Sequence, residues 1–183
     1  MAVRLADALV AVHRRLDDAA LPHAFGGAIA LGYCLREPRA TMDIDVNVFV
    51  GVGRSDEVLI ALPTGVDVTD TDRRVLARDG QVRVWWYEIP VDVFLSNHWF
   101  HGVAEAAVRH VPFADVPDLP VLACAHLAVF KTFFGRPKHA IDVANMVASG
   151  TVDLEALGAT TERLLDDERN DFLALVRRFV AEM

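Results

Sequence analysis

Two kinds of apolar pattern alternate along the first part of the chain. Short apolar or alternating runs predict strands at 23–25, 42–50, 81–87, 91–95 and 108–113, with a weaker one at 66–68. Apolar residues at helical spacing predict helices at 2–20, 28–35, 56–62, 70–79 and 97–107. From residue 121 only the helical pattern remains, at 121–134, 138–147 and in two further helices between 154 and 180. This order favours an α+β fold, a small mixed sheet with helices on one face followed by a helical C-terminal bundle.

The change of pattern falls at Val116-Pro117-Asp118-Leu119-Pro120, where two prolines lie close together. Proline lacks a backbone donor and restricts the residue before it, so this stretch is typical of a linker. We therefore predict two regions, a sheet-bearing core over 1–115 and a helical region over 116–183. With 183 residues, 53% of them hydrophobic, the chain suits one compact domain or a domain with a helical annex.

The acidic balance of the chain bears on its partners. The formal net charge is −8 at pH 7, which opposes non-specific binding of nucleic acid, because that binding depends on Lys and Arg neutralising phosphates. An RNA substrate would require the basic residues to cluster. The candidates for such a cluster are Arg36, Arg39, Lys131, Arg136 and Lys138.

The compartment and the state of the thiols are expected from the same composition. The first residues carry charge and do not resemble a signal peptide, and no apolar run reaches the ~20 residues that span a bilayer. We expect a cytoplasmic protein without a membrane segment. Cys34 and Cys124 lie in apolar surroundings with no metal-ligand spacing, so we expect two buried, reduced thiols.

Acidic residues alternate with β-branched residues in the strand predicted at 42–50. Asp43 and Asp45 would share one face of that strand, with Cβ atoms about 7 Å apart, while the apolar residues face the core. Carboxylates at this spacing can converge on one divalent ion or on a pair of ions that clamp a phosphoryl transfer. The alternative is the solvated face of an antiparallel sheet, and this segment by itself favours neither interpretation.

A diglycine turn lies upstream of this strand. Gly26 and Gly27 follow a short apolar strand and precede a helical pattern. Glycine lets backbone N–H groups approach a ligand closely, and the start of a helix offers unpaired donors and a positive dipole end. Together these features favour a phosphate-binding turn.

Gly-Gly, a helix, and Arg-x-Thr-x-Asp-Ile-Asp-Val at 39–46 resemble the core signature of the DNA polymerase β-like nucleotidyltransferase superfamily. The resemblance covers roughly residues 20 to 148 and is greatest to the branch that contains the AbiEii-type and MenT-type toxins. It implies that the core over 1–115 is a nucleotidyltransferase core. It also implies Mg²⁺ as cofactor, an NTP as substrate, Gly26 and Gly27 at the phosphates, and Asp43 and Asp45 as metal ligands.

A third carboxylate is expected on a neighbouring strand. Asp92 is the only charge in the apolar run at 91–95, and a carboxylate there is costly to bury unless it is paired or bound to metal. The family pattern of an aspartate between apolar residues matches Val91-Asp92-Val93, which implies Asp92 as third metal ligand. A solvent-facing residue at the Pro90 turn is the other interpretation, and Asp67 and Asp70 are the alternative ligands.

Two helical residues extend the resemblance beyond the sheet. Lys131 lies on a helix that is apolar nearly all round, so it needs a partner or a route to water. Lys131 and Asp142 match a lysine and a downstream aspartate of the toxin branch, which implies catalytic roles, with Lys131 at the nucleotide phosphates. His139 stands where the family often has an acid. The alternative for Asp142 is a surface pair with Lys138.

These residues predict transfer of a nucleoside monophosphate from an NTP to an acceptor hydroxyl. Lys131 and Arg39 would offset charge on the leaving pyrophosphate, and Thr41 is interpreted as a strand-entry residue that can also matter for activity. A first hypothesis is a toxin-like enzyme that acts on tRNA 3′ ends and is controlled by an antitoxin. A second is a small-molecule nucleotidyltransferase of the antibiotic-modifying kind, which fits the acidic charge better. A third is a degenerate nucleotide-binding module.

Overall fold

The computed structural model describes residues 4–164 and 170–183. The described residues form two compact units. The first unit comprises the chain up to Ile29 together with Ala40–Leu122, and the second comprises Ala30–Arg39 together with the chain from Ala123 onward. A compact unit is a different property from a domain that folds by itself, so the predicted organisation into 1–115 and 116–183 stays a prediction.

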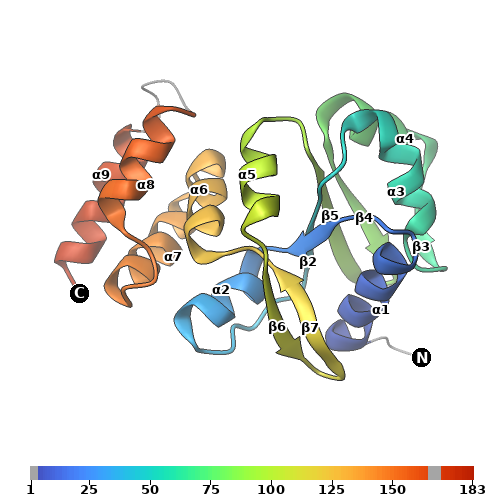
Figure 1. Ribbon diagram of the computed structural model, residues 1–183, viewed down its shortest axis with the longest axis horizontal. Coiled ribbons are helices and arrows are strands. Elements are labelled where there is room, and N and C mark those ends of the chain that lie inside the picture. The colour runs from blue at the N-terminus through green and yellow to red at the C-terminus, as the bar shows by residue number, and fades with distance from the viewer. Residues whose placement is uncertain (1–3, 165–169) are drawn as a thin grey trace. The chain divides into compact units, whose positions relative to one another are not determined.

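The first unit is built on a seven-stranded mixed sheet in the order β3-β4-β5-β2-β1-β7-β6. Strand β2 pairs in parallel with β5, and β1 with β7, while the other neighbours are antiparallel. Figure 1 shows β2 and β5 side by side within this unit. The strand bounds are β1 His23–Phe25, β2 Ile44–Val48, β3 Val66–Asp67, β4 Gln81–Trp86, β5 Ile89–Leu95, β6 Arg109–Phe113 and β7 Val116–Val121.

The two central strands have one apolar face and one polar face. Ile44, Val46 and Val48 of β2 are fully buried, and so are Val91 and Val93 of β5. Their alternation with polar residues places the carboxylates of both strands on the opposite face of the sheet. The α+β prediction is thereby confirmed, and the apolar face fixes the register that brings the polar side chains together.

Helices of the first unit connect the strands, and local sequence explains both ends of α4, Asp70–Asp79. Thr69 and Asp72 form a reciprocal capping box at the start of α4, and Gly80 ends that helix in the left-handed conformation. Ser55 is the first residue of α3, and it is buried. The helices of this unit are α1 Leu5–Asp18, the 3-10 turn Val52–Arg54, α3 Ser55–Ala61, α4 Asp70–Asp79 and α5 Phe100–Ala106, and α2 Gly27–Leu35 begins in it.

The predicted linker at 116–120 is wrong. The stretch forms β7, which pairs with both β1 and β6. Pro117 is tolerated because it lies at the irregularity of the β6–β7 ladder between Val111 and Phe113, whereas Pro120 is opposite His110 in the regular part of the ladder. Pro90 is likewise inside β5, opposite Trp85, rather than ahead of the strand. At both places the prolines lie within strands, where the sequence had predicted a linker or a turn.

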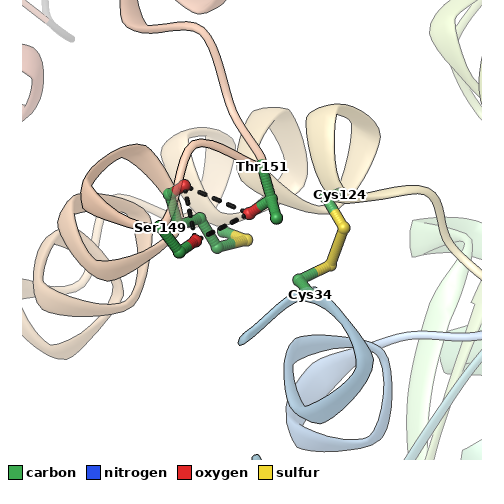
Figure 2. Close-up of a disulfide and its surroundings, with 5 residues drawn as sticks. Cys34, Cys124, Ser149 and Thr151 are labelled. Carbon is green, nitrogen blue, oxygen red and sulfur yellow. Dashed lines mark hydrogen bonds between the residues drawn. A yellow bond between two sulfur atoms is a disulfide. The ribbon is translucent and has the colours of Figure 1, made fainter. Parts of the chain in front are cut away.

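The second unit is helical. It contains α6 Cys124–Phe134, α7 Pro137–Ala148, α8 Leu154–Glu162 and α9 Asn170–Ala181, together with the later part of α2. The hydroxyls of Ser149 and Thr151 both donate to the carbonyl of Met146 and close the end of α7 (Figure 2). No helix in the described part of the chain is long and apolar enough to cross a membrane.

The two cysteines form a disulfide, so the expectation of two separate reduced thiols is wrong. Cys34, near the end of α2, is bonded to Cys124, the first residue of α6, with Cα atoms 5.6 Å apart (Figure 2). That separation lies in the usual range for a disulfide. The two residues are 90 positions apart in sequence, and only the packing of the two helices brings them together.

Candidate active site

Asp92, Asp45 and the diglycine turn lie in one row across the sheet of the first unit, and Asp43 lies directly before strand β2. Asp45 of β2 is directly opposite Asp92 of β5, and the two strands run parallel. Opposed residues of adjacent strands are about 5 Å apart and point to the same face. On the other side of Asp45, its backbone carbonyl accepts a 2.9 Å hydrogen bond from the N–H of Gly26. The structure thus brings Asp45, Asp92 and the diglycine turn together.

Asp43 precedes β2 by one residue and is held by a neighbouring hydroxyl. The Thr41 Oγ1 donates to Asp43 Oδ1 at 2.6 Å, and the backbone N–H of Asp43 donates to Thr41 Oγ1 at 3.3 Å. This local turn orients the carboxylate before the strand begins. Thr41, interpreted from the sequence mainly as a strand-entry residue, therefore positions one of the predicted ligands.

The two glycines differ in how strictly they are required. A Cβ on Gly27 would overlap the Asp45 carboxylate, and Gly27 also has a positive φ of 50° at the start of α2. A Cβ on Gly26 would approach Asn47 Nδ2 at 3.2 Å and Leu122 Cδ1 at 3.3 Å, which small shifts can relieve. Gly27 is the position that allows the turn to lie directly against Asp45.

Arg83 was missed by the sequence analysis, although it contacts two of the predicted ligands. It lies opposite Asp92 across β4 and β5, and its Nε and Nη2 donate to Asp92 Oδ1 and Oδ2 at 2.7 and 2.5 Å. Its Nη2 also lies 3.6 Å from Asp43 Oδ2. These hydrogen bonds, and then the surrounding carboxylate charges, raise the pKa of Arg83 further above its ordinary value. The guanidinium therefore stays charged beside the carboxylates.

The pairing of Arg83 with Asp92 could have been found from the hairpin. The turn between β4 and β5 consists of Tyr87 and Glu88, and Tyr87 has a positive φ of 54°. A two-residue hairpin turn fixes the register of both strands, and counting outward from it places Arg83 opposite Asp92. No glycine or asparagine marks this turn, so its type was not recognised from the sequence.

The alternative third carboxylates lie elsewhere in the first unit. Asp67 is on β3, which is separated from β2 by two strands, and Asp70 is the first residue of α4. Only Asp92 among the three candidates is opposite Asp45. The register therefore favours Asp92, whose role as a metal ligand stays a prediction.

The donor chemistry of the row fits a hard divalent cation. Asp43, Asp45 and Asp92 offer only carboxylate oxygens, the ligands that Mg²⁺ prefers in proteins. As they stand, however, no three His, Cys, Asp or Glu side chains among residues 4–164 and 170–183 are arranged to hold a metal ion. Both Asp92 oxygens are taken by Arg83. The carboxylate ligands are therefore of the kind that binds Mg²⁺. In this structure, however, the carboxylates are paired with the guanidinium of Arg83.

The second unit brings together the other predicted residues. Lys131 is 8% exposed, and its Nζ lies 2.8 Å from Asp142 Oδ2, while Arg39 Nη2 lies 3.2 Å from Asp142 Oδ1. Within the described residues, Asp142 pairs with these two cations and not with Lys138. Burial and then the nearby Lys131 charge lower the pKa of His139 to about 4. The buried Lys131 thus has Asp142 as its partner. The alternative of a surface pair between Asp142 and Lys138 is not what the structure shows.

A separate pocket opens at the far end of β1 from the diglycine turn. Its volume is about 480 Å³, and its lining includes His13, His23, His110 and three carboxylates, but none of the predicted site residues. His23 Nδ1 donates to the Leu21 carbonyl at 2.8 Å, so its Nε2 accepts from His13 Nδ1 at 2.9 Å. If both imidazoles were charged, both nitrogens of this contact would be donors, so at most one of the two rings can be protonated. Burial is the main cause that lowers the pKa of both rings. The pocket is thus a histidine site distinct from the carboxylate row.

Two solved structures of ANT(2″)-Ia have a fold similar to that of this chain. The crystal structure of ANT(2″)-Ia in complex with adenylyl-2″-tobramycin is 12% identical, with a TM-score of 0.56 over 94% of this chain and 97% of that one. The solution structure of the antibiotic-resistance factor ANT(2″)-Ia is 13% identical, with a TM-score of 0.57 over 97% and 93%. No protein-family model and no curated protein matches the sequence. The chain therefore has a nucleotidyltransferase-like fold, which the likeness shows at the level of fold alone.

Proposed function

We propose that this protein is a Mg²⁺-dependent nucleotidyltransferase that moves a nucleoside monophosphate from an NTP to a hydroxyl of a small, cationic molecule. The observation that carries the proposal is the row formed by Asp92, Asp45 and the diglycine turn, inside a nucleotidyltransferase-like fold. In such a transfer the acceptor oxygen bonds to the α-phosphorus, the bond to the β-phosphate oxygen breaks, and pyrophosphate leaves.

Each predicted residue of the first unit has a separate role in the proposed reaction. Asp43, Asp45 and Asp92 would hold the divalent ions, which when bound stabilise phosphoryl oxygens and lower the pKa of an acceptor hydroxyl. Thr41 orients Asp43 through its 2.6 Å hydrogen bond. Gly26 and Gly27 would let backbone donors at the start of α2 approach the phosphates.

The roles of Lys131, Asp142 and Arg39 rest on the sequence resemblance and on their ion pairs. Two cations on one partly buried carboxylate keep the local charge positive, since Lys131 and Arg39 together exceed Asp142 by one charge. Such a group suits a polyanion such as pyrophosphate. We propose that Lys131 and Arg39 offset charge on the leaving group and that Asp142 positions Lys131.

Two observations favour a small acceptor over RNA. ANT(2″)-Ia, which is similar to this chain over nearly its whole length, was solved with an adenylylated aminoglycoside. The net charge of −8 attracts cations and repels a nucleic-acid backbone. The tRNA-modifying, antitoxin-controlled alternative draws its support from the residue match at Lys131 and Asp142, which are paired at 2.8 Å.

Label transfer from each NTP tests the proposal and separates the acceptors. The protein is incubated with one α-phosphate-labelled NTP, Mg²⁺, and either tobramycin or total RNA. Cation-exchange paper then retains a labelled aminoglycoside, and acid precipitates labelled RNA. We expect label on the small cation. Label in tRNA would support the toxin-like alternative, and pyrophosphate release with neither acceptor labelled would point to another acceptor class.

Variants at matched aspartates show whether the row does the chemistry. Asp92→Asn should reduce kcat/KM at least about 100-fold, since even partners of a ligand cost 10- to 100-fold when removed. Asp67 is an exposed aspartate on β3 that the sequence also suggested as a ligand. The kcat/KM of Asp67→Asn should stay close to that of wild type. Equal activity of the two variants would remove Asp92 from the site.

A further inference from the structure

The guanidinium of Arg83 occupies the coordinating atoms of Asp92. Its Nε and Nη2 engage Oδ1 and Oδ2 of that carboxylate, and its Nη2 lies 3.6 Å from Asp43 Oδ2. The placement is set by the backbone, because Arg83 is directly opposite Asp92 in the β4–β5 ladder. The two-point contact is the strong geometry for an arginine–carboxylate pair. In this state the row already contains one cation.

A divalent ion and this guanidinium compete for the same oxygens. An Mg²⁺ ion binds carboxylate lone pairs at short distance, and both Asp92 oxygens already accept from Arg83. Two cations beside one carboxylate also repel each other, and the repulsion is stronger at Asp92, whose side chain is 15% exposed, than in open water. Arg83 has room to move away, because its side chain is 48% exposed.

We propose that Arg83 is the resident counter-ion of the carboxylate row and that a divalent ion reaches Asp92 by displacing it. The inference rests on the proposed function, in which Asp43, Asp45 and Asp92 are metal ligands. Arg83 then has two consequences for the protein. It holds three like charges together before metal binds, and it raises the Mg²⁺ concentration at which the site fills.

The test is the affinity for Mg²⁺ alone, with no nucleotide present. Isothermal titration with MgCl₂ compares wild type, Arg83→Gln, Arg83→Lys and a control, Arg78→Gln. Arg78 makes the same kind of two-point contact, with Asp79 at 2.6 and 2.6 Å, away from the row. We expect Arg83→Gln to bind Mg²⁺ about tenfold more tightly or better, because an adjacent charge changes the occupancy of a carboxylate by that order. Arg83→Lys should be intermediate, and Arg78→Gln should match wild type.

A second comparison separates displacement from a general structural effect. In an Asp92→Asn background, Arg83→Gln should no longer tighten Mg²⁺ binding, because the contested ligand is gone. Unchanged or weaker affinity in Arg83→Gln would overturn the proposal, and so would a tightening that persists without Asp92. If circular dichroism shows that Arg83→Gln does not fold, Arg83→Lys is used instead. Its Mg²⁺ affinity is then compared with wild type, and again in the Asp92→Asn background.

The result also distinguishes this inference from the function on which it rests. Equal Mg²⁺ binding by wild type and Arg83→Gln would remove the counter-ion role and leave the metal site standing. Absence of Mg²⁺ binding in wild type and in every variant would overturn the inference alone, because in the proposed reaction Mg²⁺ is also held by the phosphates of the NTP, and label transfer tests that reaction separately. If wild type shows no measurable Mg²⁺ binding while Arg83→Gln binds Mg²⁺, the result would support the inference.

Discussion

At the scale of single residues, the site depends on one close approach. Gly27 lies against the Asp45 carboxylate so tightly that any side chain there would overlap it. The same residue has a left-handed φ, which only glycine adopts at low cost. Gly27 therefore couples the start of α2 to the centre of the carboxylate row.

Replacing Gly27 by alanine should both destabilise the protein and disturb the row. The left-handed backbone costs alanine about 1–2 kcal/mol, and the overlap with Asp45 adds to that cost. Urea unfolding should show the loss of free energy, and Mg²⁺ titration should show weakened binding. Gly51→Ala is the control, because a Cβ there meets nothing within 4 Å, and it should stay within about 0.5 kcal/mol of wild type. Equal effects at both glycines would contradict the close approach.

At the scale of elements, the alternation in β2 and β5 was sufficient to predict the acidic face. Asp45 and Asp92 each stand among buried β-branched residues, and the strand period places them outward. The family resemblance placed Asp92 on a strand next to that of Asp45, but the pattern of residues could not give the parallel direction or the register of β2 and β5, because non-local pairing depends on the whole sheet. It also missed β7, since proline is a weak guide to strands with irregular partners.

The β1 region offers a prediction on pH. In the folded protein, His13 and His23 share a hydrogen-bond chain that ends at the Leu21 carbonyl, and burial lowers the pKa of both below the ordinary 6.5. As the pH falls below about 6.5, the two histidines bind protons in the unfolded chain more readily than in the folded chain, because their pKa values are lower in the folded chain. The free energy of unfolding therefore decreases. The charged and titratable groups around the pair are Arg14, Asp17, His110 and Asp118.

Thermal unfolding at pH 7.5 and 5.0 checks this dependence. The Tm of wild type should drop between the two pH values by at least about 2 °C more than the Tm of His23→Phe, which lacks the pair. His23 is 7% exposed, so the variant is expected to be less stable at both pH values while its pH dependence is flatter. Parallel pH dependence of the two proteins would show that the imidazole pair does not contribute.

At the scale of the whole molecule, a covalent bond closes a long loop. Cys34 and Cys124 are 90 positions apart, so the bond restricts a large part of the unfolded chain. Spacing in the sequence could not predict this pair, since disulfide geometry depends on how α2 and α6 pack. The four helices at the end of the chain were predicted from their period. The ion pair of Lys131 with Asp142 was not predicted, although both residues were candidates for the site.

Breaking the disulfide should lower stability without changing the sheet. Loss of a bond over a loop of this length costs about 2–4 kcal/mol, which corresponds to a Tm decrease of roughly 5–15 °C for a chain of this size. Cys34→Ser with Cys124→Ser, and wild type treated with reductant, should melt at similar temperatures below oxidised wild type. Alkylation followed by mass spectrometry reports the thiols. A Tm that is unaffected by reductant would contradict a stabilising bond.

The most direct test of the central claim is Mg²⁺-dependent binding of a non-hydrolysable NTP, measured by calorimetry on wild type and Asp45→Asn. Asp45 lies between Asp92 and the diglycine turn, so its loss should abolish the binding while the fold is retained. We expect heat of binding for wild type only when Mg²⁺ is present, and none for Asp45→Asn. Binding that is independent of Mg²⁺, absent from wild type, or unchanged in Asp45→Asn would contradict it.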